Sequence, residues 1–226
     1  AYHSDVDVAE NGDMIVKETI SIVAEGIQIR RGIVRDFPLT MVDGDRRTVR
    51  VGFDLLSVKR DGQDEPYHTE MIDRGIRIYT GAEDKFLSLG QHVYELIYKV
   101  DRMVRHFPDH DEIYWNVTGT GWQFSIAQAS ARISLPGGEV IKTAAYTGPF
   151  GSTASRASAQ IDGNRADFVT TRSLGPHEGL TVVVAAPKGV IAPPSDAQLW
   201  AWWMRDHMAD IVAVAGLVLI SLHYAF

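Results

Sequence analysis

The sequence predicts an all-β fold, an antiparallel β-sandwich formed as one unit or as two consecutive lobes, followed by one C-terminal transmembrane α-helix. Residues 1–192 consist of short segments rich in Val, Ile, Tyr, Phe and Thr, separated by Gly, Pro, Asp and Asn turns. No long amphipathic helical pattern interrupts these segments, which argues against a βαβ fold. Residues 209–226, by contrast, are almost entirely apolar.

The individual strands follow from alternation and from turn residues. Val6 and Val8 alternate with Asp5 and Asp7, and Asn11-Gly12 then provides a type I′ hairpin signal. The return strand reads MIVKETISIVA. Further strands are expected at residues 46–60, 65–72, 75–80, 91–104, 112–118, 122–135, 139–147, 157–162, 165–172 and 179–187. A polar segment near residues 107–111 is where the β-rich domain, residues 1–192, would divide into two lobes.

Composition excludes several classes of function. Asp and Glu outnumber Lys and Arg by 29 to 22, so a uniformly basic nucleic-acid-binding surface is not expected. The absence of Cys excludes disulfides, thiolate catalysis and Cys-ligated metal centres. No GxSxG, P-loop, GxGxxG or HExxH motif occurs in the required context. We therefore expect no cofactor, and the sequence leans against an enzyme without excluding one.

The C-terminal segment, residues 193–226, predicts a short turn and a membrane-spanning helix. Pro193-Pro194 ends the preceding segment, and Ser195 with Gln198 forms a capping box. The uninterrupted apolar run at residues 211–220 is short for a bilayer. Aromatic residues extend it on both sides and are expected at the two membrane interfaces: Trp200, Trp202, Trp203 and Tyr224.

The ends of the chain give the expected location. The sequence begins with Ala1 rather than Met, so we expect that a signal peptide has been removed, and that the cytoplasmic continuation after Phe226 is truncated. These features predict a cell-membrane protein with its N-terminal domain outside the cytoplasm; that the membrane is a bacterial one is implied only by the family resemblance given below. A buried or amphipathic C-terminal helix is the alternative, but residues 211–222 lack the polar face that it needs.

One charged residue stands on an apolar strand face. Alternation places Glu18 with Val16, Ile20 and Ile22, and burying a lone carboxylate costs several kcal/mol. Arg31 and Arg35 in RRGIVRDFP are the nearest candidate partners, and we favour Arg35 slightly. A structural ion pair that fixes strand register is the simpler interpretation, and a ligand-binding or catalytic role is the alternative.

Two further clusters are candidate sites. The segment HFPDHDE contains five potential metal ligands in seven residues, of which the candidates for zinc or manganese are His106, Asp109, His110 and Asp111, with Glu112 beside them. Pro108 prevents a regular helix there, so a solvated loop is the favoured reading. The segment YWNVTGTGW contains Trp115, Asn116 and Trp122, which could form an aromatic ligand surface, although such rings more often fill a sandwich core.

Four stretches in this order together resemble the DUF2207 family of predicted bacterial membrane proteins, which includes the YciQ-like proteins: YHSDVDVAENGDMIVKETI, RGIVRDFP, DEIYWNVTGTGW and EGLTVVVAAPKGVIAPP. The resemblance extends over nearly the whole chain and implies an N-terminal extracytoplasmic domain followed by a membrane helix. It implies no established activity. The matching positions are Glu18, Arg31, Gly32, Arg35, Trp115, Asn116, Gly119 and Trp122.

These observations favour a membrane-anchored extracytoplasmic binding or scaffold domain of a bacterial envelope protein. Its expected partners are the lipid bilayer and either another envelope protein or the missing C-terminal part of its own chain, with no nucleic acid. The alternative is an envelope hydrolase or carbohydrate-binding domain that uses the 106–112 cluster or the Trp115–Trp122 aromatics.

Overall fold

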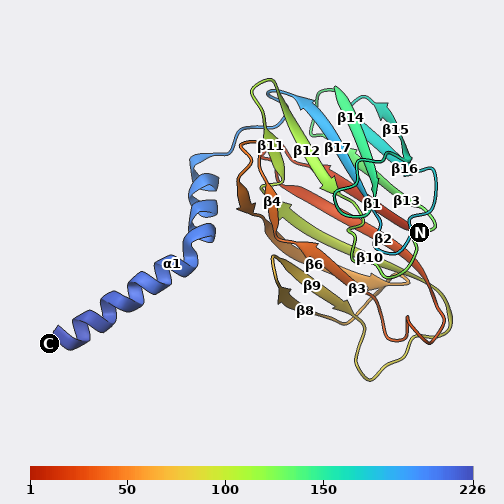
Figure 1. Cartoon of the computed structure of the whole chain (residues 1–226), viewed down its shortest axis with the longest axis horizontal. Coiled ribbons are helices and arrows are strands. Elements are labelled where there is room, and N and C mark those ends of the chain that lie inside the picture. The colour runs from red at the N-terminus through yellow and green to blue at the C-terminus, as the bar shows by residue number, and fades with distance from the viewer. Residues whose placement is uncertain (226) are drawn as a thin grey trace.

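The computed structural model describes the backbone of residues 1–225 and their side chains except those of residues 222, 224 and 225. Within these residues the chain forms strands β1–β17 and helix α1, so the expected β-rich body with a C-terminal helix is confirmed (Figure 1). The predicted interface residue Tyr224 lies outside the described side chains.

The largest sheet has eight strands in the order β15-β16-β13-β1-β2-β10-β6-β7. Its neighbours pair antiparallel except β1 and β13, which run parallel. This sheet therefore combines strands from before and after segment 107–111. The bounds are β1 Tyr2–Val8, β2 Met14–Ala24, β6 Gly52–Arg60, β7 Gln63–Asp64, β10 Gly90–Asp101, β13 Ala129–Ser134, β15 Ala157–Asp162 and β16 Arg165–Thr170.

Three smaller antiparallel sheets complete the body. The four-stranded sheet has the order β11-β12-β17-β14, with bounds Val104–His106, His110–Asn116, Gly179–Pro187 and Lys142–Gly148. The three-stranded sheet has the order β3-β9-β8, with bounds Val34–Pro38, Gly75–Thr80 and Tyr67–Ile72. Strands β4 (Thr40–Val42) and β5 (Thr48–Arg50) form a separate pair.

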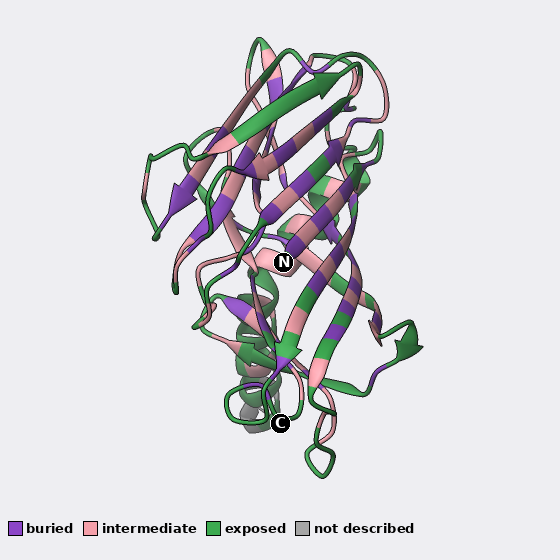
Figure 2. Cartoon of the chain, turned by 90° about the vertical axis from the view of Figure 1, so that its right-hand side faces the viewer, coloured by how far each residue is buried: buried purple, intermediate pink, exposed green. Residues whose placement is uncertain are grey.

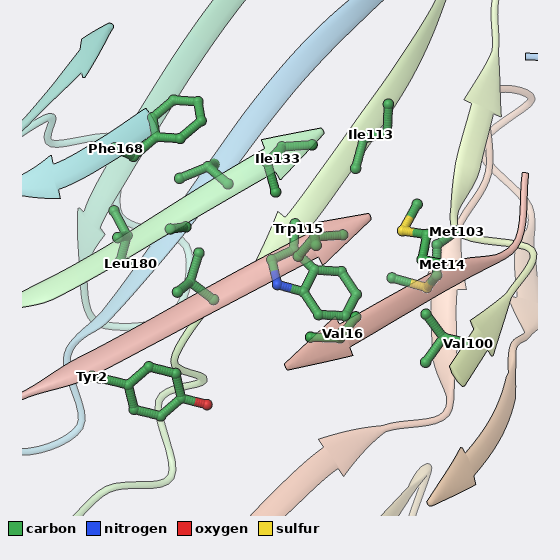
Figure 3. Packing of buried hydrophobic residues seen from close by; sticks show 14 of the residues in the cluster. Tyr2, Met14, Val16, Val100, Met103, Ile113, Trp115, Ile133, Phe168 and Leu180 are labelled. Atoms are coloured by element: carbon green, nitrogen blue, oxygen red, sulfur yellow. The ribbon is translucent and has the colours of Figure 1, made fainter. Parts of the chain in front are cut away.

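The hydrophobic core lies where the large sheet meets the smaller ones. Buried and more exposed residues alternate along the long strands, as the bands in Figure 2 show. Aromatic rings from three sheets meet in the core: Phe37 of β3 lies 5.4 Å from Tyr98 of β10 and 6.0 Å from Trp115 of β12, centroid to centroid. Figure 3 shows the Trp115 indole among buried side chains that include Val16 and Ile133.

Three local expectations differ from the structure. The expected strand 46–60 is two strands in different sheets, interrupted at Val51, whose N–H donates to Leu39 O at 3.1 Å. The expected strand 122–135 begins only at Ala129 and follows an irregular segment. The first hairpin has a longer connection at residues 9–13, where Gly12 but not Asn11 has positive φ, whereas a type I′ turn needs both.

Helix α1 spans Asp196–Ala225 and begins at the capping box that the sequence predicts. Gln198 N donates to Ser195 Oγ at 3.3 Å, and Ser195 N donates to Gln198 Oε1 at 3.0 Å. These reciprocal bonds satisfy backbone donors that a helix start leaves without partners. Beyond its first turns the helix extends away from the β body (Figure 1).

Two reciprocal ion pairs attach α1 to the end of β10. Arg205 donates to both oxygens of Asp101, at 2.7 and 2.9 Å, and Arg102 donates to Asp206 at 2.7 Å. Gly52 leaves room for this contact, because a Cβ there would lie 2.5 Å from the Arg205 guanidinium and 2.6 Å from Asp101 Oδ2. Its N–H also donates to Asp101 Oδ1 at 2.6 Å. We call these two ion pairs the helix mount.

The tryptophans at the start of α1 differ in their surroundings. Trp200 and Trp203 stack with ring centroids 5.2 Å apart, and both are exposed. Trp202 instead faces the β body, with the Arg102 guanidinium 5.1 Å from its ring centroid. Their placement at a membrane interface stays a prediction. Within the part of the chain whose side chains are described, no helix is long and apolar enough to cross a membrane.

The helix mount generates a testable prediction. Reversing one charge with Asp206→Arg places two guanidinium groups together, so we expect a broader distribution of distances between spin labels on the β body and on α1. The double variant Arg102→Asp with Asp206→Arg restores opposite charges, and Asp tolerates the positive φ at position 102. We expect it to narrow the distribution again. Equal distributions in all three proteins would contradict a helix held by these pairs.

Candidate functional site

The buried pair Glu18–Arg35 lies beneath the candidate site. Glu18 on β2 is 0% exposed and Arg35 on β3 is 3% exposed. Arg35 donates through Nη2 to Glu18 Oε1 at 2.8 Å and through Nε to Oε2 at 3.0 Å. This two-point contact satisfies both carboxylate oxygens. Arg31, the second candidate partner, is exposed and holds its guanidinium over the Phe86 ring, 4.6 Å from the centroid.

Two tyrosines complete the surroundings of the pair. The Tyr98 hydroxyl donates to Glu18 Oε1 at 2.6 Å, and the Tyr2 ring lies 5.9 Å from the Arg35 guanidinium carbon. Burial, followed by the Glu18 charge, raises the pKa of Tyr98 well above its ordinary value, so the hydroxyl keeps its proton. For Arg35, burial is the largest single influence and acts to lower the pKa, but the Glu18 charge, the electrostatic effect of Tyr2 and the hydrogen bond to Glu18 together outweigh it, so the pKa is raised. The Arg35 guanidinium therefore stays protonated.

The resembling stretch 111–122 closes over Arg35. Gly119 has φ +70°, and a Cβ there would lie 3.0 Å from Arg35 Nη1. Glycine therefore allows the positive φ of this turn and also leaves room for the Arg35 guanidinium. Trp122 Nε1 donates to Thr118 O at 2.8 Å, and its ring packs edge-on against Tyr2 at 6.1 Å. Four family-matching positions thus lie close together. Two of them, Glu18 and Arg35, form the buried charge pair, Gly119 lies against Arg35, and Trp122 packs on Tyr2 beside it.

A groove opens beside this network, which we call the apolar groove. It has a volume of about 660 Å³ and lies between the end of β2, the start of β10 and segment 122–127. A smaller hollow of about 330 Å³, which reaches Arg35, adjoins it. The residues that line both are Gln28, Ile29, Ile33, Trp122 and Phe124. The charge pair therefore adjoins the groove through this smaller hollow, which Arg35 lines.

Two loops next to the groove expose apolar side chains. Loop 25–33 presents Ile27, which is 78% exposed, and loop 81–89 presents Leu89, which is 74% exposed, and Phe86. The loops are joined where Leu87 N donates to Arg30 O at 2.8 Å. Exposed apolar side chains gathered on one surface mark an interaction site more often than scattered ones do.

His92 fastens the second loop to the sheet. It lines the apolar groove, and its Nδ1 lies 2.7 Å from Asp61 Oδ2 while its Nε2 lies 2.8 Å from Ser88 O. Because a carboxylate and a carbonyl both accept, each ring nitrogen must donate, which requires the protonated imidazole. The bond to Asp61, followed by that to Ser88, raises the pKa of His92 above 6.5, and His92 in turn lowers the pKa of Asp61.

The structure separates the residues that were candidate metal ligands. His106 Nδ1 lies 2.7 Å from buried Asp111, which also accepts from Lys188 Nζ at 2.7 Å, and His110 pairs with Asp109 at 2.8 Å. Among the described residues, no group of three His, Asp or Glu side chains converges to hold a metal ion. The reason is local, because the turn at residues 107–110 directs the two imidazoles to different carboxylates.

The candidate aromatic surface also divides. Trp115 is buried in the core and is not available to a ligand, because alternation along β12 turns it inward. Asn116 is half-buried and accepts from Gly119 N at 3.1 Å through Oδ1. Trp122 is half-buried and lines the apolar groove. Only Trp122 of these three therefore belongs to the site described above.

Sequence reasoning missed Tyr98, His92 and the two apolar loops. Tyr98 and His92 have the same parity in the expected strand 91–104, which places both on its inward face and could have indicated polar contacts there. No local signal places Leu89 next to loop 25–33, because that contact depends on the packing of distant segments.

This architecture defines a predominantly antiparallel β domain with a C-terminal helix. A sequence profile described as "Predicted membrane protein (DUF2207) N-terminal domain" matches residues 1–186. The chain belongs to the DUF2207 family. It is 27% identical over 191 residues to the uncharacterized protein YciQ of Escherichia coli, covering 83% of this chain and 30% of YciQ. The chain thus spans less than a third of that relative.

Solved structures resemble the fold at low sequence identity. The structure of yeast LTA4 hydrolase in complex with bestatin has a TM-score of 0.51 and 10% identity, covering 80% of this chain and 28% of that one. An M1 zinc metallopeptidase from Deinococcus radiodurans has a TM-score of 0.43 and 12% identity, covering 80% of this chain and 40% of that one. The first similarity indicates the fold alone, and the activities in these names belong to those proteins.

The buried pair predicts a strong and specific loss of stability. Arg35→Met leaves Glu18 buried without a counter-charge and should lower the free energy of unfolding by about 3–5 kcal/mol in chemical denaturation. The triple variant Glu18→Leu, Arg35→Met and Tyr98→Phe removes all three polar groups of the network at once. No buried charge is then left without a partner, so the triple variant should recover most of the lost stability. The matched control is Lys17→Met, which breaks a partly exposed ion pair between the β2 neighbour of Glu18 and Glu95 of β10. It should cost at most about 1 kcal/mol.

A loss of stability in Arg35→Met as small as that in Lys17→Met would contradict the conclusion that Glu18 depends on Arg35 as its buried counter-charge.

The His92 contacts predict a pH dependence. Since the folded-state pKa of His92 is raised, its contribution is complete below about pH 6.5 and is lost as pH rises through the folded-state pKa. The lowered pKa of Asp61 keeps that carboxylate charged throughout this window. The difference in melting temperature between the wild type and His92→Gln should therefore be larger at pH 6 than at pH 9. A difference that does not change with pH would exclude a protonated His92.

Proposed function

We propose that this chain is the membrane-anchored, extracytoplasmic binding or scaffold domain of a bacterial envelope protein. Residues 1–192 form the binding domain in this proposal, and residues 193–226 form the turn and the anchor. The apolar groove with its two exposed loops is the binding surface. Its occupant is a polypeptide, either another envelope protein or the remaining part of the full-length chain.

The groove and its loops are the observation that carries the proposal. Ile27 and Leu89 hold apolar side chains in water next to a hollow large enough for several partner side chains. The loops are not loose, because His92 and the Arg30–Leu87 contact fix them. A surface prepared in this way loses less conformational entropy on binding than a mobile one.

The anchor is supported by the surface of α1 and by the family. The helix extends away from the β body, and its apolar side chains in the stretch 212–220 are exposed around the helix, with Val212, Leu217 and Leu219 among them (Figure 1). A lipid bilayer would cover such a surface. The family is described as a predicted membrane protein. The helix mount would then hold the β body at a fixed angle to the membrane.

The hydrolase alternative finds no support in the described residues. His106 and His110 pair with separate carboxylates, and no nucleophilic side chain is bonded to either imidazole. A carbohydrate-binding site formed by the Trp115–Trp122 aromatics is not supported either, because Trp115 is buried in the core. The binding or scaffold function is therefore the one that the geometry supports best.

Cross-linking in native membranes tests this proposal. A photoreactive residue at Ile27 or Leu89 of the full-length protein should form one adduct of defined mass, or an internal link to the C-terminal part of the same chain. The matched control position is Met71 on β8, which is 69% exposed but lies away from the groove. It should form no such product. Equal yields at all three positions, or none in several growth conditions, would contradict the proposal.

A further inference from the structure

The outer face of the four-stranded sheet forms a second concave surface. Along β12, alternation turns Ile113 and Trp115 into the core and Tyr114 and Asn116 outward. The same alternation along β14 turns Tyr146 outward. The two tyrosines therefore stand on the two strands that flank β17, on the same face of the sheet.

The side chains on this face differ in size from strand to strand. Central strand β17 contributes the small residues Thr181, Val183 and Ala185, whereas its neighbours contribute Tyr114 and Tyr146. The β17 residues form a floor, and the two tyrosines rise from opposite sides at successive levels, with Ala144 across from Tyr114 and Asn116 across from Tyr146. We call the resulting depression, which runs along the strand direction, the tyrosine trough.

The trough consists of two adjoining hollows. One has a volume of about 580 Å³ and the other about 430 Å³, and both are lined by Tyr114 and Tyr146. The two tyrosines thus stand at the middle of one elongated site. Among the described residues, neither tyrosine hydroxyl has a hydrogen-bond partner in the protein, so both are free to bind a ligand.

A third aromatic ring stands at one end. Phe150 lines the smaller hollow and is 95% exposed. Its loop is held to the end of β14, because Ser152 Oγ donates to Thr147 O at 2.8 Å and Thr147 N donates to Ala154 O at 2.6 Å. A phenyl ring kept almost fully in water by an ordered loop is unfavourable unless another molecule covers it.

The charges of the trough indicate an uncharged ligand. The hollow beside Phe150 is lined by no Asp, Glu, Lys or Arg. In the other hollow the charged side chains are balanced in sign: Arg105 pairs with Glu112 at 3.2 Å, and Lys142 and Asp109 carry opposite charges. Arg105 also lies 4.2 Å from the Tyr114 ring centroid, which fixes that ring. A nucleic acid or another strongly charged chain would find no complementary charge here.

The geometry points to a binding site for an uncharged oligosaccharide in the tyrosine trough. Sugar rings present apolar C–H faces that stack on Tyr114, Tyr146 and Phe150, and hydroxyl groups that bond to the polar lining. The Asn116 amide and the Thr181 hydroxyl stand on the trough face to provide such bonds. An elongated site with a ring at its middle and at one end suits a chain of several sugars.

This site is separate from the apolar groove, since the two share no lining residue. The inference therefore goes beyond the proposed polypeptide-binding function and does not depend on it. An envelope domain with both surfaces would connect a polypeptide partner to a glycan.

Calorimetric titration tests the inference with three neutral probes: cellohexaose, chitohexaose and maltohexaose. The chain is purified in a detergent without a sugar head group. At least one probe should bind, and raising the salt concentration should leave its affinity unchanged. Tyr114→Ala and Tyr146→Ala should each weaken binding by about tenfold or more. Tyr114→Phe and Tyr146→Trp should retain it, because the stacking ring remains.

The matched control is Tyr67→Ala, which removes an exposed tyrosine of β8 outside the trough and should leave sugar affinity unchanged. Circular dichroism checks that each variant is folded. Failure of all three sugars to bind would overturn the inference, and so would an uncharged extended decapeptide that binds in their place with the same tyrosine dependence. Cross-linking yields at Ile27 and Leu89 should not change in the trough variants. The sugar-binding inference and the proposed polypeptide-binding function are therefore tested independently of each other.

Discussion

The ion pair between Glu18 and Arg35 is the interaction on which the rest of this domain depends. Two charges removed from water are tolerated only when each meets the other with good geometry and the remaining polar atoms find partners. Here β2 provides the carboxylate, β3 the guanidinium, and β10 the Tyr98 hydroxyl. Gly119 provides space for the guanidinium. These four segments therefore depend on one another, because β2 and β3 provide the two opposite charges, β10 provides a hydrogen bond to the carboxylate, and the segment around Gly119 leaves room for the guanidinium.

The same logic explains what could be predicted from the sequence. Glu18 disturbs a regular apolar alternation, so its burial and its need for a partner follow from parity alone. The choice of Arg35 over Arg31 also follows alternation, since Arg35 shares the inward face of β3 with Phe37. For Trp115 the sequence left two interpretations, a ligand surface and a place in the core. The second was the simpler one, and the ring is buried. The Glu18–Arg35 region was thus accessible from short-range pattern and elementary electrostatics.

Other features depend on packing between distant segments and gave no local signal. The parallel pairing of β1 with β13, the approach of loop 81–89 to loop 25–33 and the helix mount all join residues far apart in the chain. The density of ligand-type residues at 106–112 left a metal centre open beside the favoured solvated loop, and among the described residues no three of these side chains converge on one point. Density in sequence is a weak guide in a tight turn, because adjacent side chains point in different directions.

Strand β10 connects the features described above. Its inward residues include His92 beside the apolar groove and Tyr98 on the buried pair, and its last residue, Asp101, belongs to the helix mount. These contacts fix the number of residues between them, since one residue more or less would turn every later side chain to the opposite face. We therefore expect relatives with these contacts to carry insertions and deletions in the loops on either side of β10 rather than within it. A conserved spacing from His92 to Asp101 would distinguish relatives that share this arrangement from those that share only the fold.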